Sequence, residues 1–234
     1  MKLSREVTVW LNRILNDYLP PIIRDQRWFG KLLTWTLFKE SSSIYMTFHE
    51  RVYEMSDEDI ALAYSNIHSG RVEWDTCLTK TCIETILKNI IGSDVLEVGC
   101  GKGYLSNLIS KKHNITACDV VVSDSVRNTY PAITFIDSPA EQLPFADKSF
   151  DTVVTTHLLE HIRDIQQAIR ELRRVCRKRL IVVVPRERPH FYTPNLHVHF
   201  FPYRYSFLLT FRPPASYSLQ KLNGEWFYCE DMVN

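Results

Sequence analysis

Three glycines at every second position mark the first place where this chain could do chemistry. They lie in VLEVGCGKGYL, residues 95–105, where an acid, Glu97, stands two residues before Gly99. Glycine has no Cβ and accepts positive φ, so such a turn brings the backbone close to a ligand. A helix that begins after the turn offers free N–H groups and the positive end of its dipole. The segment predicts a ligand site in which Glu97 accepts hydrogen bonds from a partly positive group.

Histidines form the second group of residues with chemical potential. His157 and His161 are four residues apart, with Glu160 between them, and residues at this spacing share one face of a helix. Histidine titrates near neutrality and suits general base catalysis, although either side chain could instead only line or brace a site. Another group, with His190, His197 and His199, follows the apolar run that ends at Pro185.

The elements that must position these residues alternate between strand and helix patterns. A first strand precedes Gly99. The segment Ile115–Val121 predicts a second strand that ends in Asp119, about 20 residues after the glycine turn. The stretch Glu171–Pro185 predicts a helix followed by a further strand. Asn223-Gly224 predicts a hairpin between strands around 216–222 and 225–232. Such alternation is typical of a doubly wound α/β fold, which binds ligands beyond the carboxyl ends of its strands.

Taken in order, these segments resemble class I S-adenosylmethionine-dependent methyltransferases of the ubiquinone/menaquinone-biosynthesis kind (methyltransferase type 11). The turn at 95–105 resembles their motif I, and AEQLPFADKSFD, residues 140–151, resembles a later motif that precedes a strand and a Glu-His pair. The resemblance covers roughly residues 75–234. It implies a Rossmann-like doubly wound seven-stranded sheet with an antiparallel last strand, and S-adenosylmethionine as cofactor.

The resemblance also implies roles for individual residues. Residues expected to contact the methyl donor are Glu97, Gly99, Cys100, Gly101, Gly103, Asp119, Ala140, Glu141 and His157. Residues expected to take part in catalysis are His157, His161 and His197. The family often has an acid directly before the Ala-Glu pair, but here that residue is Pro139. Adenine recognition is therefore expected from backbone near Ala140 and Glu141, or from Asp137 in a shifted register.

A divalent metal is a further possibility that the resemblance raises without favouring it. Some members bind a metal through E-x-x-E-H and a later residue, whereas this chain has H-x-x-E-H. Glu160 and His161 would be ligands here, with His197 or His199 as the later one. Imidazole and carboxylate ligands suit zinc, iron or manganese.

Composition excludes several other classes of protein. The 234 residues contain 28 Lys and Arg and 27 Asp and Glu, so a net charge of +1 argues against broad nucleic-acid binding. The basic run over 170–179 has helical spacing and predicts a solvated helix face. Six cysteines without a C-x-x-C pair indicate reduced thiols and a cytoplasmic protein. No apolar run has the length of a membrane span, and no signal-peptide pattern is visible.

Residues 1–74 differ from the rest by their many aromatic side chains and predict a helical N-terminal cap on a methyltransferase domain at 75–234. Helices are expected over Val7–Tyr18, Asp25–Phe38 and Asp57–Asn66, with Ser56 as an N-cap of the last. The cap could also serve as a lid, or as an interfacial helix that makes peripheral membrane contact. The oligomeric state is not indicated by the sequence.

The function expected from these features is methyl transfer to a hydroxyl or amine of a small-molecule acceptor, such as a sugar, a lipid precursor or a secondary metabolite. One alternative is a methyltransferase that acts on an RNA terminus or a protein. Another is a non-catalytic S-adenosylmethionine-binding partner subunit.

Overall fold

The computed structural model describes residues 14–38, 42–56, 58–60, 63, 76–192 and 195–232. The chain divides into two compact units. Unit 1 comprises Met1–Trp74 and Glu187–Phe200, and unit 2 comprises Asp75–Arg186 and Phe201–Asn234.

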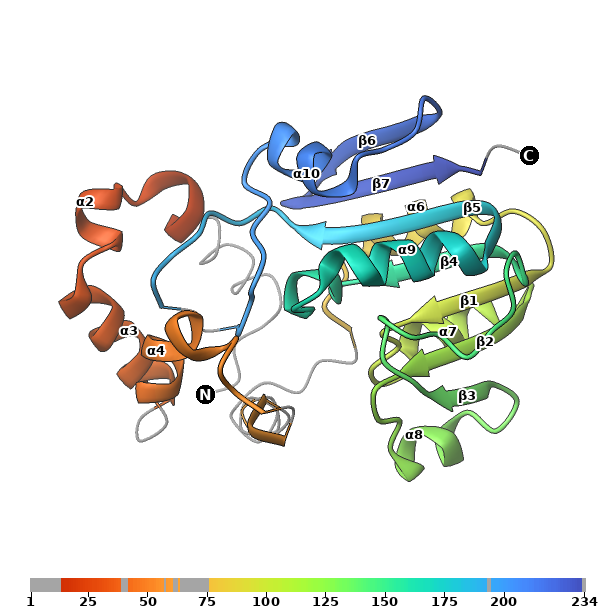
Figure 1. Ribbon diagram of the computed structural model, residues 1–234, viewed down its shortest axis with the longest axis horizontal. Coiled ribbons are helices and arrows are strands. Elements are labelled where there is room, and N and C mark those ends of the chain that lie inside the picture. Colours follow the sequence, from red (N-terminus) through yellow and green to blue (C-terminus); the bar gives the residue numbers. More distant parts are fainter. Residues whose placement is uncertain are drawn as a thin grey trace. The chain divides into compact units, whose positions relative to one another are not determined.

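Unit 2 is built on a seven-stranded sheet in the order β3-β2-β1-β4-β5-β7-β6 (Figure 1). The strands are β1 (Asp94–Val98), β2 (Asn114–Asp119), β3 (Thr134–Asp137), β4 (Phe150–Thr156), β5 (Cys176–Pro185), β6 (Tyr217–Leu222) and β7 (Glu225–Asp231). Strands β1 to β5 pair in parallel, and β7 pairs antiparallel with both β5 and β6. The expected seven-stranded sheet with antiparallel strands at its end is confirmed.

The central strands are apolar on both faces because helices cover both. In β5, Leu180, Val182 and Val184 belong to a core cluster with α9 (Ile165–Val175) and α10 (Arg204–Phe211). The alternate residues, Ile181 and Val183, belong to a second cluster with α6 (Lys80–Asn89) and α7 (Tyr104–Ile109). Successive side chains of a strand point to opposite faces, so an uninterrupted apolar run is what a sheet covered on both sides requires. The remaining helix, α8 (Asp124–Thr129), follows β2.

The basic run around α9 is not simply a solvated face, as its spacing had indicated. Arg174 donates to both carboxylate oxygens of Glu171 and to the carbonyls of Leu143 and Phe145. Other pairs are Arg173–Glu230, Arg177–Asp151, Lys178–Asp151 and Arg179–Asp231. The two arginines of α9 hold a loop and β7 to the helix, and the three cations of β5 pair with acids of the neighbouring strands. Spacing along one helix could not show this, because most of these acids come from other elements.

Two predicted boundaries are confirmed by the structure. The hairpin at Asn223-Gly224 has φ of 44° and 93° at the two turn residues. The second strand ends at Asp119, whose carboxylate accepts the N–H of Val120.

Unit 1 is helical in its described parts. Its elements are η1 (Ile14–Tyr18), α2 (Pro21–Arg24), α3 (Arg27–Phe38) and α4 (Ser42–Arg51). The predicted helix over Asp25–Phe38 corresponds to α3, whereas α4 was not predicted. Most of Val7–Tyr18 and of Asp57–Asn66 lies outside the described residues, but Ser56 does cap the latter segment through its hydroxyl, which accepts the N–H of Asp59 at 3.1 Å.

Residues 187–200 group with unit 1, although the sequence analysis assigned them to the domain at 75–234. Packing explains the correction. Leu196 is fully buried in a cluster with Tyr45, Phe48 and Val52, and the His197 carbonyl lies 2.7 Å from His49 Nε2. Within the described ranges, no helix has the length and apolar character to cross a membrane.

Candidate functional site

The carboxyl ends of the parallel strands in unit 2 bring the predicted donor residues to one edge of the sheet. The N–H groups of Gly99 and Cys100 both donate to the carbonyl of Cys118, at 2.8 and 3.1 Å. The N–H of Ser138, after β3, donates to the carbonyl of Asp119 at 2.8 Å. The turns after β1, β2 and β3 are therefore tied together by backbone hydrogen bonds.

The three glycines of the turn adopt left-handed φ, but the space beside them differs. A Cβ on Gly99 would meet Leu158 at 3.0 Å, and one on Gly103 would meet Tyr130 at 3.1 Å. At Gly101, φ is +50° and an added Cβ would meet nothing within 4 Å. Close packing of neighbouring side chains therefore requires glycine at positions 99 and 103, whereas Gly101 leaves open space beside the backbone. A ligand that approaches the turn needs such a cradle.

Glu97 is buried in β1 behind this turn, with 2 % of its surface exposed. Burial raises the pKa of its carboxyl to about 8, and the nearby charge of Asp119 also raises it. A hydrogen bond from the Ser106 hydroxyl partly opposes this by lowering the pKa. Near neutral pH the empty site therefore holds mostly a protonated carboxyl. A cationic ligand group would restore the charge.

Asp119 at the end of β2 is held in place by backbone donors. Its Oδ2 accepts the N–H of Gly101 at 2.8 Å and its Oδ1 accepts the N–H of Val120 at 2.8 Å. Each carboxylate oxygen has further lone pairs for ligand hydroxyls. Cys100 is buried, and burial raises the pKa of its thiol, so this residue offers backbone and not thiolate to the site.

The turn after β3 provides buried backbone and no free acid. Ala140 is buried, and the Ser138 hydroxyl donates to the carbonyl of Gln142 at 3.0 Å. The Asp137 carboxylate accepts from Arg127 Nη2 and from the N–H of Val122, both at 2.7 Å. Asp137 is committed to these partners, which favours backbone near Ala140 and Glu141 for adenine recognition.

His157 occupies a constrained position directly after β4. Its backbone has φ of 50°, and its N–H donates to the carbonyl of Val183. The ring lies between two buried carboxylates, with Nε2 3.0 Å from Glu225 and Nδ1 3.4 Å from Glu160. Burial alone would lower the pKa of this imidazole, but the two carboxylates raise it to about 10. A histidine that is charged at neutral pH is a brace between acids and a poor general base.

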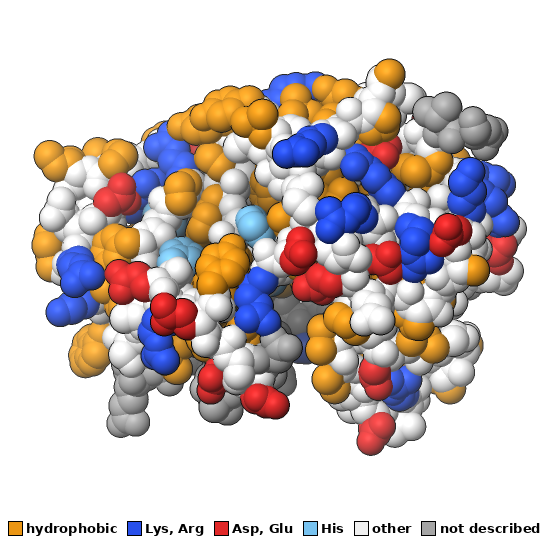
Figure 2. All heavy atoms as spheres, viewed as in Figure 1, with side chains coloured by type: hydrophobic (Ala, Val, Ile, Leu, Met, Phe, Trp, Pro, Cys, Tyr) orange, Lys and Arg blue, Asp and Glu red, His pale blue; other side chains and the backbone are white. Residues whose placement is uncertain are grey.

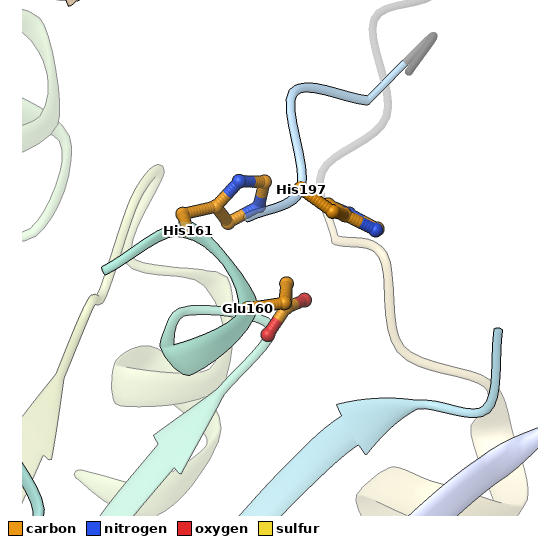
Figure 3. Close-up of side chains that lie close together, drawn as sticks. All are labelled: Glu160, His161 and His197. Carbon is orange, nitrogen blue, oxygen red and sulfur yellow. The ribbon is translucent and has the colours of Figure 1, made fainter. Parts of the chain in front are cut away.

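The other candidate histidines come from different parts of the chain. Figure 3 shows Glu160 and His161 on the short helix after β4, which is η3 (Leu159–His161), and His197 on the segment after β5. Glu160 is buried and His161 is half-buried. Within unit 1, His197 is buried and its Nδ1 lies 2.8 Å from Glu187, while His199 is half-buried.

His190 belongs to an aromatic stack of unit 1. Its ring lies parallel to Tyr192, with centroids 5.3 Å apart. Burial and the charge of Arg24 lower the pKa of this imidazole to about 4, so it is neutral near pH 7. This agrees with a packing role for His190.

Three polar partners of the candidate residues were not singled out from the sequence. Ser106 follows Glu97 by nine residues, on the first turn of α7, and a polar residue at a helix start was an available signal. Glu225 is 68 residues from His157 in the chain. Glu187 partners His197 from ten residues away, across an irregular segment. Nothing in the local pattern indicates either of these two acids.

Comparison with known proteins agrees with this geometry. Residues 96–184 match the family model described as a methyltransferase domain. A probable S-adenosylmethionine-dependent methyltransferase of Mycobacterium tuberculosis is 36% identical over 91 residues, which cover 36% of this chain and 32% of that protein. The ubiquinone biosynthesis O-methyltransferase of Rickettsia conorii is 31% identical over 96 residues, covering 38% of this chain and 33% of that protein. The chain thus spans about a third of the length of these relatives.

A solved structure shows the same fold. The 1,6-didemethyltoxoflavin-N1-methyltransferase of Burkholderia thailandensis superimposes with a TM-score of 0.52 and 16% identity, over 65% of this chain and 77% of that one. The strand order, the glycine turn with its two acids and the matched family model all lie in unit 2. Residues 96–184 thus match a methyltransferase domain, and the chain shares its fold with a solved methyltransferase.

Proposed function

We propose that this chain transfers a methyl group from S-adenosylmethionine to a hydroxyl or amine of a small-molecule acceptor. The observation that carries the proposal is the turn between β1 and α7, where Gly101 leaves open space beside its backbone and donates its N–H to the Asp119 carboxylate. Bound S-adenosylmethionine supplies a methyl already activated by the positive sulfur.

The donor site is assigned entirely to residues of unit 2. Glu97 would receive the amino group of the methionine end, since a buried carboxyl with a raised pKa gains most from a cationic partner. Asp119 would accept the ribose hydroxyls, because backbone donors already orient both of its oxygens. Backbone of Ala140 and Glu141 would border the adenine. Gly99, Cys100 and Gly103 shape the turn, and His157 would border the site as a fixed charged ring.

Catalysis requires alignment of the acceptor and removal of its proton. We assign the proton-accepting role to His197, with His161 as the second candidate, and assign His157 to positioning. The Glu187 carboxylate on His197 Nδ1 fixes the ring and its tautomer, which makes Nε2 the nitrogen that would take a proton. By contrast, both nitrogens of His157 face carboxylates.

A divalent metal is a secondary hypothesis. Glu160 and His161, with His197 or His199, carry the right ligand atoms, but His157 stands where related metal enzymes have a glutamate and its two nitrogens are engaged by Glu160 and Glu225. Metal analysis of untagged protein beside a His161→Ala variant tests this. Stoichiometric metal in the wild type alone would support it, and its absence from both preparations would remove it.

Support for a small-molecule acceptor comes from the near-neutral charge and from the relative in Rickettsia conorii, whose name is that of a ubiquinone biosynthesis O-methyltransferase. The test is an assay with radiolabelled donor on metabolite extract, total RNA and protein extract. Label in small molecules is expected. Label in RNA or protein would favour the first alternative, and donor binding without transfer to any fraction would favour a non-catalytic partner subunit.

A further inference from the structure

Helix α3 of unit 1 buries small residues and exposes several large apolar ones, which is the reverse of an ordinary amphipathic helix. It buries its small residues, Gly30 and Thr34, and the Thr34 hydroxyl donates to the carbonyl of Gly30 at 2.8 Å. A Cβ on Gly30 would approach Tyr192 to 2.6 Å, so the glycine is what permits this close packing. Trp28, Leu32 and Trp35 therefore lie on its outer face, while Phe29 and Leu33 are half-buried.

That outer face consists of large apolar side chains in solvent. Trp28, Leu32 and Trp35 are 60%, 55% and 63% exposed. They stand at positions i, i+4 and i+7, which line one side of a helix. On α2, Ile22 is also 77% exposed. Of the twelve large hydrophobic residues that are exposed among those the structure describes, six fall between Tyr18 and Trp35. Scattered exposed apolar residues are normal, but such a concentration marks an interaction surface.

An open groove extends this apolar surface. It lies between α3 and α4, has a volume of about 540 Å³ and is bordered by Leu32, Trp35 and Met46. Lys31, Ser42 and Thr47 also line it. A lining that combines large apolar side chains with polar ones suits an occupant that is itself both apolar and polar.

Charge and side-chain chemistry indicate what covers the face. Helix α3 contains two basic residues, Arg27 and Lys31, and no acidic one. Both basic side chains are exposed, and Arg27 makes only a loose 3.6 Å pair with the exposed Glu50. Tryptophan combines an apolar ring with a polar N–H and favours the boundary between lipid tails and headgroups. Figure 2 shows hydrophobic, basic and acidic side chains intermingled over this part of unit 1.

We propose that α2 and α3 dock unit 1 on the surface of a lipid bilayer that contains anionic lipids. Trp28, Leu32, Trp35 and Ile22 enter the interface, and Arg27 and Lys31 lie against the headgroups. The contact is peripheral, and it is independent of which acceptor the chain methylates.

The test is sedimentation of the full chain with phosphatidylcholine vesicles, with and without phosphatidylglycerol. Stronger binding to the anionic vesicles is expected, weakened by salt. Trp28→Ser combined with Trp35→Ser should lower the apparent affinity about tenfold or more, and Leu32→Ser should lower it several-fold. The matched control is Leu209→Ser, which removes an exposed leucine from α10 in unit 2 and should change nothing. Lys31→Glu should weaken binding to anionic vesicles, whereas Lys111→Glu in unit 2 should not.

Circular dichroism and S-adenosylhomocysteine binding confirm that each variant is folded. Three results would overturn the proposal: no binding to either kind of vesicle, binding that the control variants weaken equally, or binding that the tryptophan pair does not affect. Concentration-dependent self-association in analytical ultracentrifugation, abolished by the tryptophan substitutions, would assign the face to a second copy of the chain instead.

Discussion

The most informative perturbation of the donor site is Glu97→Gln, because it removes a charge and keeps the shape. With a pKa of about 8, the Glu97 carboxyl is ionised in about one molecule in eleven at pH 7, and ionising it costs about 1.4 kcal/mol. A ligand ammonium that pairs with Glu97 must therefore drive off its proton. Glutamine can still accept the Ser106 hydrogen bond through its amide oxygen, so the variant should fold.

Calorimetric titration with S-adenosylhomocysteine in buffers of different ionisation enthalpy counts this proton. At pH 7 the wild type should release most of one proton on binding, and the release should fall as the pH rises past 8, where Glu97 is already ionised. The Gln variant should release almost none and should bind at least about tenfold more weakly. 5′-Methylthioadenosine lacks the α-amino group of the methionine end, so its binding should release no proton with either protein. Equal proton release by wild type and variant would refute the assignment of Glu97 to the amino group.

Three further predictions follow from the same geometry. Gly101→Ala should cost only about 1–2 kcal/mol of unfolding free energy, for its left-handed φ, but should abolish donor binding, whereas Gly103→Ala should be less stable because its Cβ meets Tyr130 and Phe135. Chemical denaturation and donor titration separate the two effects. Normal donor binding by Gly101→Ala would contradict a role for the open space at Gly101. His157→Gln should lower the unfolding free energy at pH 7 by about 3–5 kcal/mol, because it removes a cation that pairs with both Glu160 and Glu225. The pKa of His157 is raised from its usual range to about 10, so the stabilisation that its charge provides is full below the usual histidine pKa and is lost as pH rises through 10. A difference in unfolding free energy between wild type and variant that widens over this interval would contradict the ion pairing of His157. His197→Asn should lower kcat by about 10²–10⁴ with donor affinity unchanged, and Glu187→Gln should lower it less; kcat values near wild type would exclude His197 as the base.

Features encoded by neighbouring residues could be predicted from the sequence. The strands on either side of the glycine turn are recognisable because the strand, the turn and the next strand end follow one another within about 25 residues, and the roles of Glu97 and Asp119 remain predictions. The apolar run of β5 likewise predicts a strand covered on both faces. The hairpin at Asn223-Gly224 is encoded in two residues.

Sequence reasoning failed where tertiary contacts decide the chemistry. The type and spacing of His157 indicate a base, whereas Glu160 together with Glu225, which comes from the start of β7, holds the ring charged between two acids. The placement of residues 187–200 with unit 1 depends on how Leu196 packs among Tyr45, Phe48 and Val52, which no local pattern reports. The side chains on the exposed face of α3 are apolar, and local sequence would place them inside. They face outward because the helix packs through Gly30 and Thr34, which are buried on its other side.

The central claim is that the turn after β1 seats S-adenosylmethionine. Equilibrium dialysis of the full chain against radiolabelled S-adenosylmethionine tests it directly, with unlabelled S-adenosylhomocysteine as competitor and folded Gly101→Ala as control. One competed site per chain in the wild type, absent from the variant, is the expected result. Folded wild type that retains no label at millimolar donor would contradict the account.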